Sequence, residues 1–526
     1  MIRLTGLMLA TVILGCGAWD PEPISCRSDS ECGDTQVCFP EGCGDPGRNI
    51  VVEVVPNPKG GLYAQDFRVD DLRSEHNLEL FDPPTLQGQV RVETTSLSST
   101  VSYGAPITLR MTGESLLIPG VVRRHETTFT PEDGGYSLPV GAGNYAVTLI
   151  APNTELPPLF DSREVRPGRS ETLDFLLPAP ASLLRLTGKV LRHDGLPMDV
   201  DLEIQALDES LRPLSQRVPV KRTTGEFSLA LPPSATWLSN VNLLVLPTSA
   251  DALVPQKMFN VDPREAQEPL SMGDYGAPVK VRGRVLGPDQ KPVPQATVYL
   301  QGRVGGGGQY RSHKVLTDES GSFEVLTLPS SGESAMTLYI VPPAGSLAGL
   351  TLKSVPVART SAVTLADVTC ATRVKVRGTL QLPSGSLPAV GVRVVAEPVG
   401  EVPGWPRPAL GAEALRTTDD SGRFELLLDP GQYRFDFLPT EGLPRVSRIV
   451  SVLPGDVELS PFTLSKGRRI TGLVSISGAR MMEPAVPYAS VRFFRVVHVE
   501  GKPSALLLSQ TLTDQSGNYS TTVPAR

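Results

Sequence analysis

Four cysteines stand close together near the start of the chain, and their thiols could form disulfides or hold a metal ion. Cys26, Cys32, Cys38 and Cys43 lie within 18 residues that contain few apolar side chains. Because such a segment cannot fold around a hydrophobic core, it needs a crosslink. In an exported chain two disulfides are expected, with three possible pairings. A zinc knot is the alternative, although zinc favours C-x-x-C spacing and a reducing compartment.

The stretch MIRLTGLMLATVILGC at the start of the sequence has the composition of an export signal, because its apolar run is far too short to span a membrane. Its last four residues, ILGC, resemble the bacterial lipobox, although Leu14 is larger than the usual residue. The resemblance implies a signal peptide at 1–15 and a lipid on Cys16 that anchors the chain in the cell envelope. Gly17 follows, which in Gram-negative sorting favours the outer membrane. The alternative is ordinary cleavage nearby, with Cys16 incidental.

An aspartate-containing phrase recurs along the chain and superficially resembles a calcium loop. It reads TDESGSFEV at 317–325, TDDSGRFEL at 418–426 and TDQSGNYST at 513–521, with looser copies TPEDGGYSL at 130–138 and TTGEFSLAL at 223–231. Calcium takes about six or more oxygen ligands, and the looser copies lack one or more of these side chains. The aspartate can instead close a turn, the glycine can supply a positive φ, and the following aromatic can enter a core. We therefore expect a turn with a core anchor and no metal site.

No other set of residues has the spacing of a catalytic centre. The five histidines, His76, His125, His193, His313 and His498, are scattered singly and form no zinc-binding helix motif. The sequence lacks a G-x-S-x-G elbow for a nucleophilic serine. The GGGG stretch at 305–308 lacks the Lys-Ser/Thr of a phosphate loop, so it is expected to be a hairpin loop. We expect no catalytic residues and no cofactor.

Two marks repeat along the sequence at the same period. The glycines of the aspartate phrase are Gly134, Gly225, Gly321, Gly422 and Gly517, and a second phrase (LQGQV, LTGKV, VRGRV, VRGTL, ITGLV) precedes each of them. Both marks recur about every 95 residues. That length suits a small domain with its own core, so the chain is expected to be a tandem array of domains.

Each repeat carries the alternating pattern of half-buried strands. In VKVRGRV, Val279, Val281 and Val285 fall on one face and the basic residues on the other. No stretch of ordinary helix length has a clean helical period, and the 49 glycines and 50 prolines punctuate the chain every few residues. This pattern predicts an all-β fold of about five sandwich domains.

The order of these phrases resembles the carboxypeptidase regulatory-like domain. That order is G-x-V, then TD-x-SG-x-F, then PG-x-Y as in DPGQYRF at 429–435, and the resemblance covers roughly 84–526. It implies a transthyretin-like, Ig-like β-sandwich, and it does not by itself indicate a function. The peptidase domain that accompanies this module in the family's founding enzymes has no counterpart in the sequence.

The expected domain boundaries follow from the phrases. They are 1–15 for the signal peptide, 16–48 for the lipidated cysteine-rich segment, 49–82 for a β half-repeat, 83–180, 183–271, 277–370 and 372–466 for four sandwiches, and 467–526 for a partial fifth. Cys370, between the third and fourth sandwiches, is expected to be a small buried thiol. Five domains arranged end to end would form a rod that reaches about 150 Å from the membrane. The net charge of −7 is spread without blocks, so nucleic acid is not an expected partner.

Two functions fit this organisation. The first is a non-enzymatic envelope lipoprotein whose repeats form a stalk or an adhesive surface for proteins, polysaccharide or other copies of the chain. The alternative is a carbohydrate-binding surface protein, since sandwiches bind sugars through exposed aromatics. Trp405 and Trp237 are the candidate platforms in the repeats, whereas Trp19 lies in the tether. Aromatics at core-anchor positions, such as Phe323, are not candidates.

The two ends of the array look like halves of one repeat. The last repeat stops just after its turn phrase, and residues 49–86 resemble the missing half, as a comparison with NYAVTLIAPN at 144–153 shows. A sandwich without its last strands would expose an unpaired edge. One hypothesis is that the halves complete each other, between neighbouring molecules if the array is extended, or within one chain if it bends strongly into a ring. The sequence favours the two alternatives, which are a self-sufficient terminal domain and local packing of 49–86 on the first repeat.

Replacing Cys16 with alanine should release the protein from membranes or block its processing, because the lipid is the expected anchor. Fractionation of cells with detergent extraction measures this. A correctly cleaved variant that still needs detergent to leave the membrane would contradict lipidation at Cys16.

Overall fold

The computed structural model describes residues 37–39, 42–44, 49–57, 62–69, 72–94, 100–131, 134–152, 155–233, 240–249, 251–265, 268–332, 334–406, 408, 414–439, 442–477, 485–499 and 502–525. In this part of the chain the regular structure is β, apart from two short 3-10 turns, η3 (Pro180–Ser182) and η5 (Gly305–Gly307). The predicted all-β fold is confirmed. The strands form five two-sheet sandwiches, named sandwich 1 to sandwich 5 in the order of their repeats, each around its own hydrophobic core.

One sheet of every sandwich is built around the first strand of its repeat, and we call it the outer sheet. In sandwiches 1 and 2 the outer strands are β6 (Thr85–Glu93), β7 (Thr100–Ser102), β10 (Gly135–Pro139), β13 (Glu171–Thr172) and β14 (Phe175–Leu177), then β15 (Leu184–Leu191), β18 (Glu226–Leu231) and β21 (Leu270–Ser271). In sandwiches 3 and 4 they are β22 (Val279–Leu286), β26 (Ser322–Thr327), β30 (Ala362–Thr364) and β31 (Val368–Thr369), then β33 (Val374–Gln381), β36 (Arg423–Leu428), β39 (Val457–Glu458) and β40 (Phe462–Thr463). In sandwich 5 they are β41 (Gly467–Ile476), β44 (Asn518–Pro524) and β5 (Leu78–Leu80).

The other sheet, which we call the inner sheet, contains the second strand of the repeat. In sandwiches 1 and 2 its strands are β8 (Ile107–Glu114), β9 (Val122–Phe129), β11 (Gly143–Ile150) and β12 (Leu159–Val165), then β16 (Leu202–Leu207), β17 (Val218–Pro219), β19 (Val241–Pro247) and β20 (Lys257–Val261). In sandwich 3 they are β23 (Thr297–Arg303), β24 (Gln309–Arg311), β25 (Val315–Leu316), β27 (Met336–Val341) and β29 (Thr351–Val355). In sandwich 4 they are β34 (Arg393–Gly400), β35 (Ala414–Thr417), β37 (Gly431–Leu438) and β38 (Val446–Val452), and in sandwich 5 β3 (Ile50–Val55), β4 (Gln65–Val69), β42 (Ser490–Val499) and β43 (Lys502–Leu512). Two short pairs remain, β1 (Val37–Phe39) with β2 (Gly42–Gly44) and β28 (Ala348–Gly349) with β32 (Ala371–Thr372).

The same connections recur in each sandwich. The first strand, for example β22, pairs antiparallel with the strand that follows the turn phrase, β26, and parallel with the late strands β30 and β31. The alternation along β22 places Val279, Val281 and Val285 in the core, as its pattern predicts, because successive side chains of a strand point to opposite faces. The core therefore lies between an outer and an inner sheet that every repeat builds in the same way.

The recurring aspartate phrase is a turn followed by a core anchor. In sandwich 4, Oδ1 of Asp419 accepts the backbone N–H groups of Ser421 and Arg423 at 2.9 and 2.8 Å, and Phe424 is buried. Asp318 and Asp514 accept the corresponding bonds in sandwiches 3 and 5. All five glycines of the phrase have a positive φ, between 69 and 81°. These observations confirm the interpretation of the phrase as a turn.

Sandwich 5 is completed by strands from the two ends of the chain. The N-terminal strand β3 pairs antiparallel with β42, so that Val52 lies opposite Phe493. In the other sheet β5 pairs parallel with β41, and Oδ1 of Asn77 accepts the N–H of Leu473 at 2.9 Å. The core of sandwich 5 contains side chains from both ends, including Ile50 and Ile470. The hypothesis that the two half-repeats complete each other is thus confirmed, completion takes place within one chain, and the favoured alternatives are wrong.

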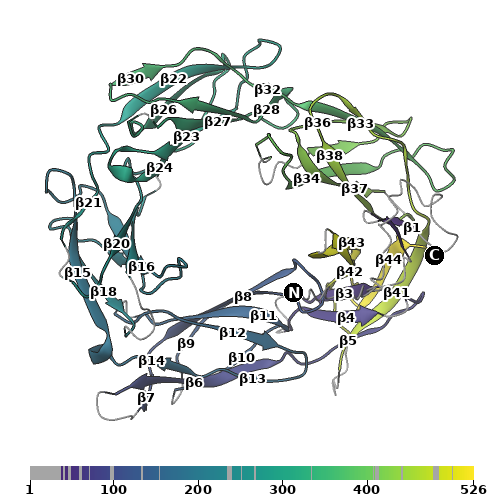
Figure 1. Cartoon of the computed structure of the whole chain (residues 1–526). Coiled ribbons are helices and arrows are strands. Elements are labelled where there is room, and N and C mark those ends of the chain that lie inside the picture. Colours follow the sequence, from purple (N-terminus) through teal and green to yellow (C-terminus); the bar gives the residue numbers. More distant parts are fainter. Residues whose placement is uncertain are drawn as a thin grey trace, which may run out of the picture.

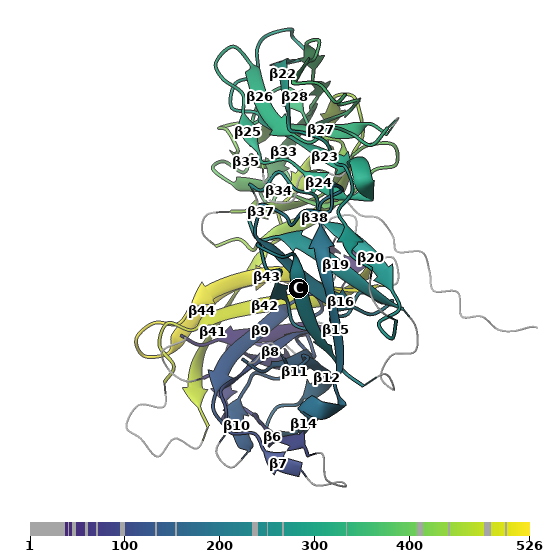
Figure 2. The same cartoon turned by 90° about the vertical axis from the view of Figure 1, so that its left-hand side faces the viewer.

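Because of this pairing the array is a closed ring (Figure 1). The inner sheets face the centre of the ring and the outer sheets form its rim. Figure 2 shows the ring from its edge, with β22 and β6 at opposite ends. The expected rod is therefore wrong, and so is the strand exchange between neighbouring molecules that an extended array would require. The sequence shows that the two halves match but contains no local signal for the curvature at each junction.

We call the pairing of the N-terminal strands β3 and β5 with β42 and β41 the seam of the ring. Next to it, buried charges and an apolar contact join sandwich 5 to sandwich 1. Arg123 of β9 donates from Nη2 to Oδ1 of Asp66 on β4 at 2.5 Å, and the same nitrogen lies 3.7 Å from Oε1 of Glu53 on β3. Arg492 of β42 lies 3.3 Å from the other oxygen of Glu53. Burial, followed by repulsion from Asp66, raises the pKa of Glu53. An apolar cluster of Val51, Ile118 and Phe494 covers the neighbouring contact.

Replacing Gly422 with valine should destabilise sandwich 4 by about 1–3 kcal/mol, because Gly422 has a φ of +69° and an added Cβ would collide with the carbonyl oxygen of Leu380. Gly385→Val is the matched control in the same sandwich. It has a φ of +73° with no neighbouring atom within 4 Å, so its loss should be smaller. Calorimetric melting measures both variants. Calcium or a chelator should leave the melting temperature unchanged, and a chelator-sensitive transition would overturn the turn-only interpretation.

Deleting residues 49–82 removes β3, β4 and β5, so β41 and β42 would each lose one of their two neighbours and the edges of both sheets would be exposed. Calorimetry should show the loss of one transition, and light scattering should show a mass that rises with concentration. A separate peptide of residues 49–82 should restore the transition by strand addition. Unchanged melting of the last sandwich after the deletion would contradict completion by the N-terminal strands.

Candidate functional site

The residues singled out at the start of the sequence fall mostly outside the described part of the chain. Cys16, Cys26 and Cys32 lie outside it, so the lipid anchor stays a prediction. Cys38 and Cys43 lie opposite each other in the β1–β2 pair. Cys43 is disulfide-bonded, but its partner is not among the described side chains, so the pairing stays a prediction. Cys370 is free and buried as expected, and burial raises the pKa of its thiol.

The other candidates from the sequence do not come together in one place. Trp405, in the loop after β34, is 37% exposed, whereas Trp19 and Trp237 lie outside the described residues. Within the described residues no group of three or more His, Cys, Asp or Glu side chains could hold a metal ion. No helix in the described part of the chain is long and apolar enough to cross a membrane.

The structure instead reveals a site where sandwich 2 meets sandwich 3. The backbones of Gln256 and Gln309 exchange two N–H···O bonds of 2.9 Å, which join the strands of the two units. The GGGG stretch lies in the loop of the β23–β24 hairpin, which confirms the expected hairpin loop. There it forms the turn η5, where Gly305 and Gly306 pack directly against the backbone of 272–274. Arg359 binds both the carboxylate and the carbonyl oxygen of Asp274. These contacts fix the geometry of the junction.

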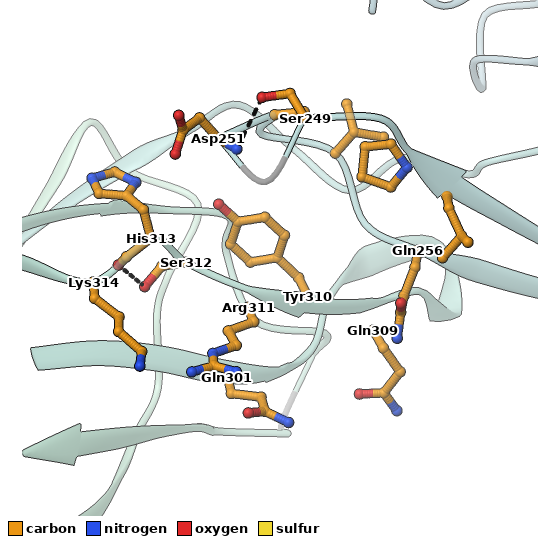
Figure 3. A pocket seen from close by; sticks show the side chains of 14 residues that line it. Ser249, Asp251, Gln256, Gln301, Gln309, Tyr310, Arg311, Ser312, His313 and Lys314 are labelled. Atoms are coloured by element: carbon orange, nitrogen blue, oxygen red, sulfur yellow. Dashed lines mark hydrogen bonds between the residues drawn. The ribbon is translucent and has the colours of Figure 1, made fainter. Parts of the chain in front are cut away.

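A cavity of about 780 Å³ lies beside this junction (Figure 3). The end of β19, the loop that follows it, β23, β24 and the segment after β24 form its walls. Its lining is mixed. Apolar residues such as Val254 contribute, and the polar residues are Ser249, Asp251, Gln256, Gln301, Gln309, Tyr310, Arg311, Ser312, His313 and Lys314. The hydroxyl of Tyr310 points toward the side where Asp251 and His313 lie, while Arg311 and Gln301 lie on the opposite side. Burial raises the pKa of the Tyr310 hydroxyl to about 12.

The cations of the cavity are held over an aromatic pair on the inner sheet. The rings of Tyr299 and Tyr339 stack with centroids 4.7 Å apart and planes at 3°. The guanidinium of Arg311 lies 4.5 Å from the centroid of Tyr299, and the ammonium of Lys314 lies 5.7 Å from it. Stacking on an aromatic face orients a guanidinium and leaves its N–H donors available in the plane. β23 and β24 lie on the side of sandwich 3 that faces the ring centre (Figure 1), so this group faces inward.

The aromatic pair is specific to sandwich 3. The five repeats place a cross-strand pair at the same position of the inner sheet, between matching core residues. These pairs are Arg110–Thr148, Gln205–Leu244, Tyr299–Tyr339, Val395–Asp436 and Arg492–Glu53 in sandwiches 1 to 5. Since the other four sandwiches fold without tyrosine there, the fold does not require it. The alternation in ATVYL and TLYIV could have placed both tyrosines on the outward face, but the sequence analysis considered only tryptophans as platforms.

No family model and no curated protein matches the chain. Among solved structures, a streptococcal ancillary pilin is similar at 17% identity and a TM-score of 0.22, over 52% of this chain and 98% of the pilin. The shaft pilin SpaA from Lactobacillus rhamnosus GG is 9% identical with a TM-score of 0.21, over 36% of this chain and 98% of the pilin. Two B repeat units of the collagen binding protein of Staphylococcus aureus are 9% identical with a TM-score of 0.15, over 70% of this chain and 100% of that one. Because these TM-scores are low, we take the fold from this chain's own strand pairing and cores.

Proposed function

We propose that the chain is a non-enzymatic scaffold of the bacterial cell envelope, lipid-anchored at Cys16, with carboxypeptidase regulatory-like sandwiches that present an interaction surface. The observation that carries this proposal is the completion of sandwich 5 by N-terminal strands. A closed ring holds its sandwiches at fixed angles, whereas domains joined by single linkers move relative to one another. Fixed sandwiches are suited to a partner that contacts more than one of them. The N-terminal lipid would attach the ring to the membrane at its seam.

The role of the ring in adhesion can be tested on whole cells. Cells that produce the full chain should attach to surfaces coated with protein or polysaccharide better than cells that lack it. Cells that produce the 49–82 deletion are the matched control, because they keep Cys16 and sandwiches 1 to 4 but lose the seam. Attachment should fall with the deletion at equal surface amounts of protein. Equal attachment by cells with and without the chain would refute the adhesive role.

Carbohydrate binding is the second candidate function, and a specific observation favours it. The cavity between sandwiches 2 and 3 is lined by amide, hydroxyl and carboxylate side chains and by two cations, and these cations lie over the ring of Tyr299, which stacks on Tyr339. Sugar hydroxyls need both donors and acceptors, and binding sites of this size are typical for small ligands. The site lies in the repeats, as the alternative from the sequence requires. Its cations lie over Tyr299, and Trp405 is not among its lining residues.

A further inference from the structure

Several basic residues of the strand faces have a carboxylate opposite them, whereas the cations of the cavity have none among the described residues. Arg282 donates to Glu324 at 2.6 Å, Arg377 to Glu425 at 2.8 Å, and Arg110 lies 3.1 Å from Glu126. Among the described residues, Arg311 and Lys314 have aromatic contacts but no ion pair. The positive charges that sandwich 3 places at this cavity are therefore available to a ligand.

The geometry around these cations favours a planar anionic group. The Tyr299 ring lies between Tyr339 and Arg311, so it restrains the guanidinium before any ligand arrives. A guanidinium presents paired donors that match the two oxygens of a carboxylate, and an oriented one loses less entropy on binding. Lys314, over the same ring, adds a second positive charge within reach of the same region.

The rest of the lining indicates what carries the anionic group. Gln256, Gln301, Gln309 and Ser249 offer donors and acceptors suited to hydroxyl groups. The carboxylate of Asp251 adds an acceptor for further hydroxyl groups. A ligand rich in hydroxyls with carboxylates on its sugar rings fits both this lining and the two cations.

We infer that the inward cavity between sandwiches 2 and 3 binds an acidic oligosaccharide, with a sugar carboxylate on Arg311 and Lys314 and hydroxyls on the glutamine and serine side chains. This inference rests on the second proposed function and specifies its ligand class. The ring places the site on its inner side, so an extended sugar chain would have to enter the ring or pass along its face to reach the site.

Calorimetric titration of the full ectodomain with an oligogalacturonate tests the inference. A neutral galactose oligomer of the same length controls for stacking and hydroxyl contacts. Binding of the acidic oligomer should be at least about tenfold tighter than binding of the neutral one and should weaken as salt is added. Equal affinity for both would overturn the carboxylate assignment. Tighter binding of a short single-stranded oligonucleotide would overturn the sugar assignment in favour of nucleic acid.

Variants locate the site. Arg311→Gln and Tyr299→Ala should each weaken binding of the oligogalacturonate by about tenfold, whereas Tyr299→Phe keeps the ring and should retain it. Arg110→Gln is the matched control, because Arg110 is an exposed residue that occupies on β8 the place of Tyr299 on β23. Melting curves check that each variant is folded. Binding that Arg311→Gln leaves unchanged would refute this site, and no binding of any oligosaccharide would refute the inference while leaving the scaffold function to the adhesion test.

Discussion

The backbone groups of β42 and β41 have to find partners, and residues near the other end of the chain supply them. β3 lies between β4 and β42, so both of its edges are paired, and β5 runs beside β41 in the second sheet. An exposed strand edge invites pairing with other chains, and the missing strands would also leave the core of sandwich 5 open. The pairing of β3 and β5 therefore both covers the exposed edges and closes the core of sandwich 5. It also turns a linear array into a ring, and every other junction has to bend to allow it.

The seam is specified by charge as well as by apolar burial. Glu53 lies buried between Arg492 of its own sandwich and Arg123 of sandwich 1, and Asp66 pairs with the same arginine. Taking such charges out of water is costly unless each finds its partner, so the arrangement favours one register strongly over its neighbours. A shift of β3 by one residue would turn Glu53 toward the core and Val52 outward. The apolar contacts around Ile118 then add stability to a geometry that the charges have selected.

Much of the fold could be predicted from the sequence because its signals are local. Within the turn phrase, the side chain of Asp419 closes the turn and Gly422 supplies the positive φ, so the turn can be recognised from a few neighbouring residues. The alternation of Val279 and Val281 likewise indicates which face of β22 points into the core. The match between the end segments also raised their completion as a hypothesis, although the sequence favoured a self-sufficient or locally packed end. The ring could not be predicted, since it depends on angles between units that no short phrase encodes. The cavity was missed for a similar reason: Asp251 and Lys314 belong to different repeats, and only the Gln256–Gln309 contact brings their loops together.

The position of the chain ends within a sandwich imposes an order on folding. β3, β4 and β5 are synthesised first, yet their partners lie in 467–524, after four complete sandwiches. At about 5–20 residues per second, the early strands wait tens of seconds before β42 exists. During that time sandwiches 1 to 4 can fold in turn, while the first segment has no native sheet to join. Closing the ring is therefore the final step of assembly, and until then each growing molecule carries an open strand that a neighbouring chain could capture.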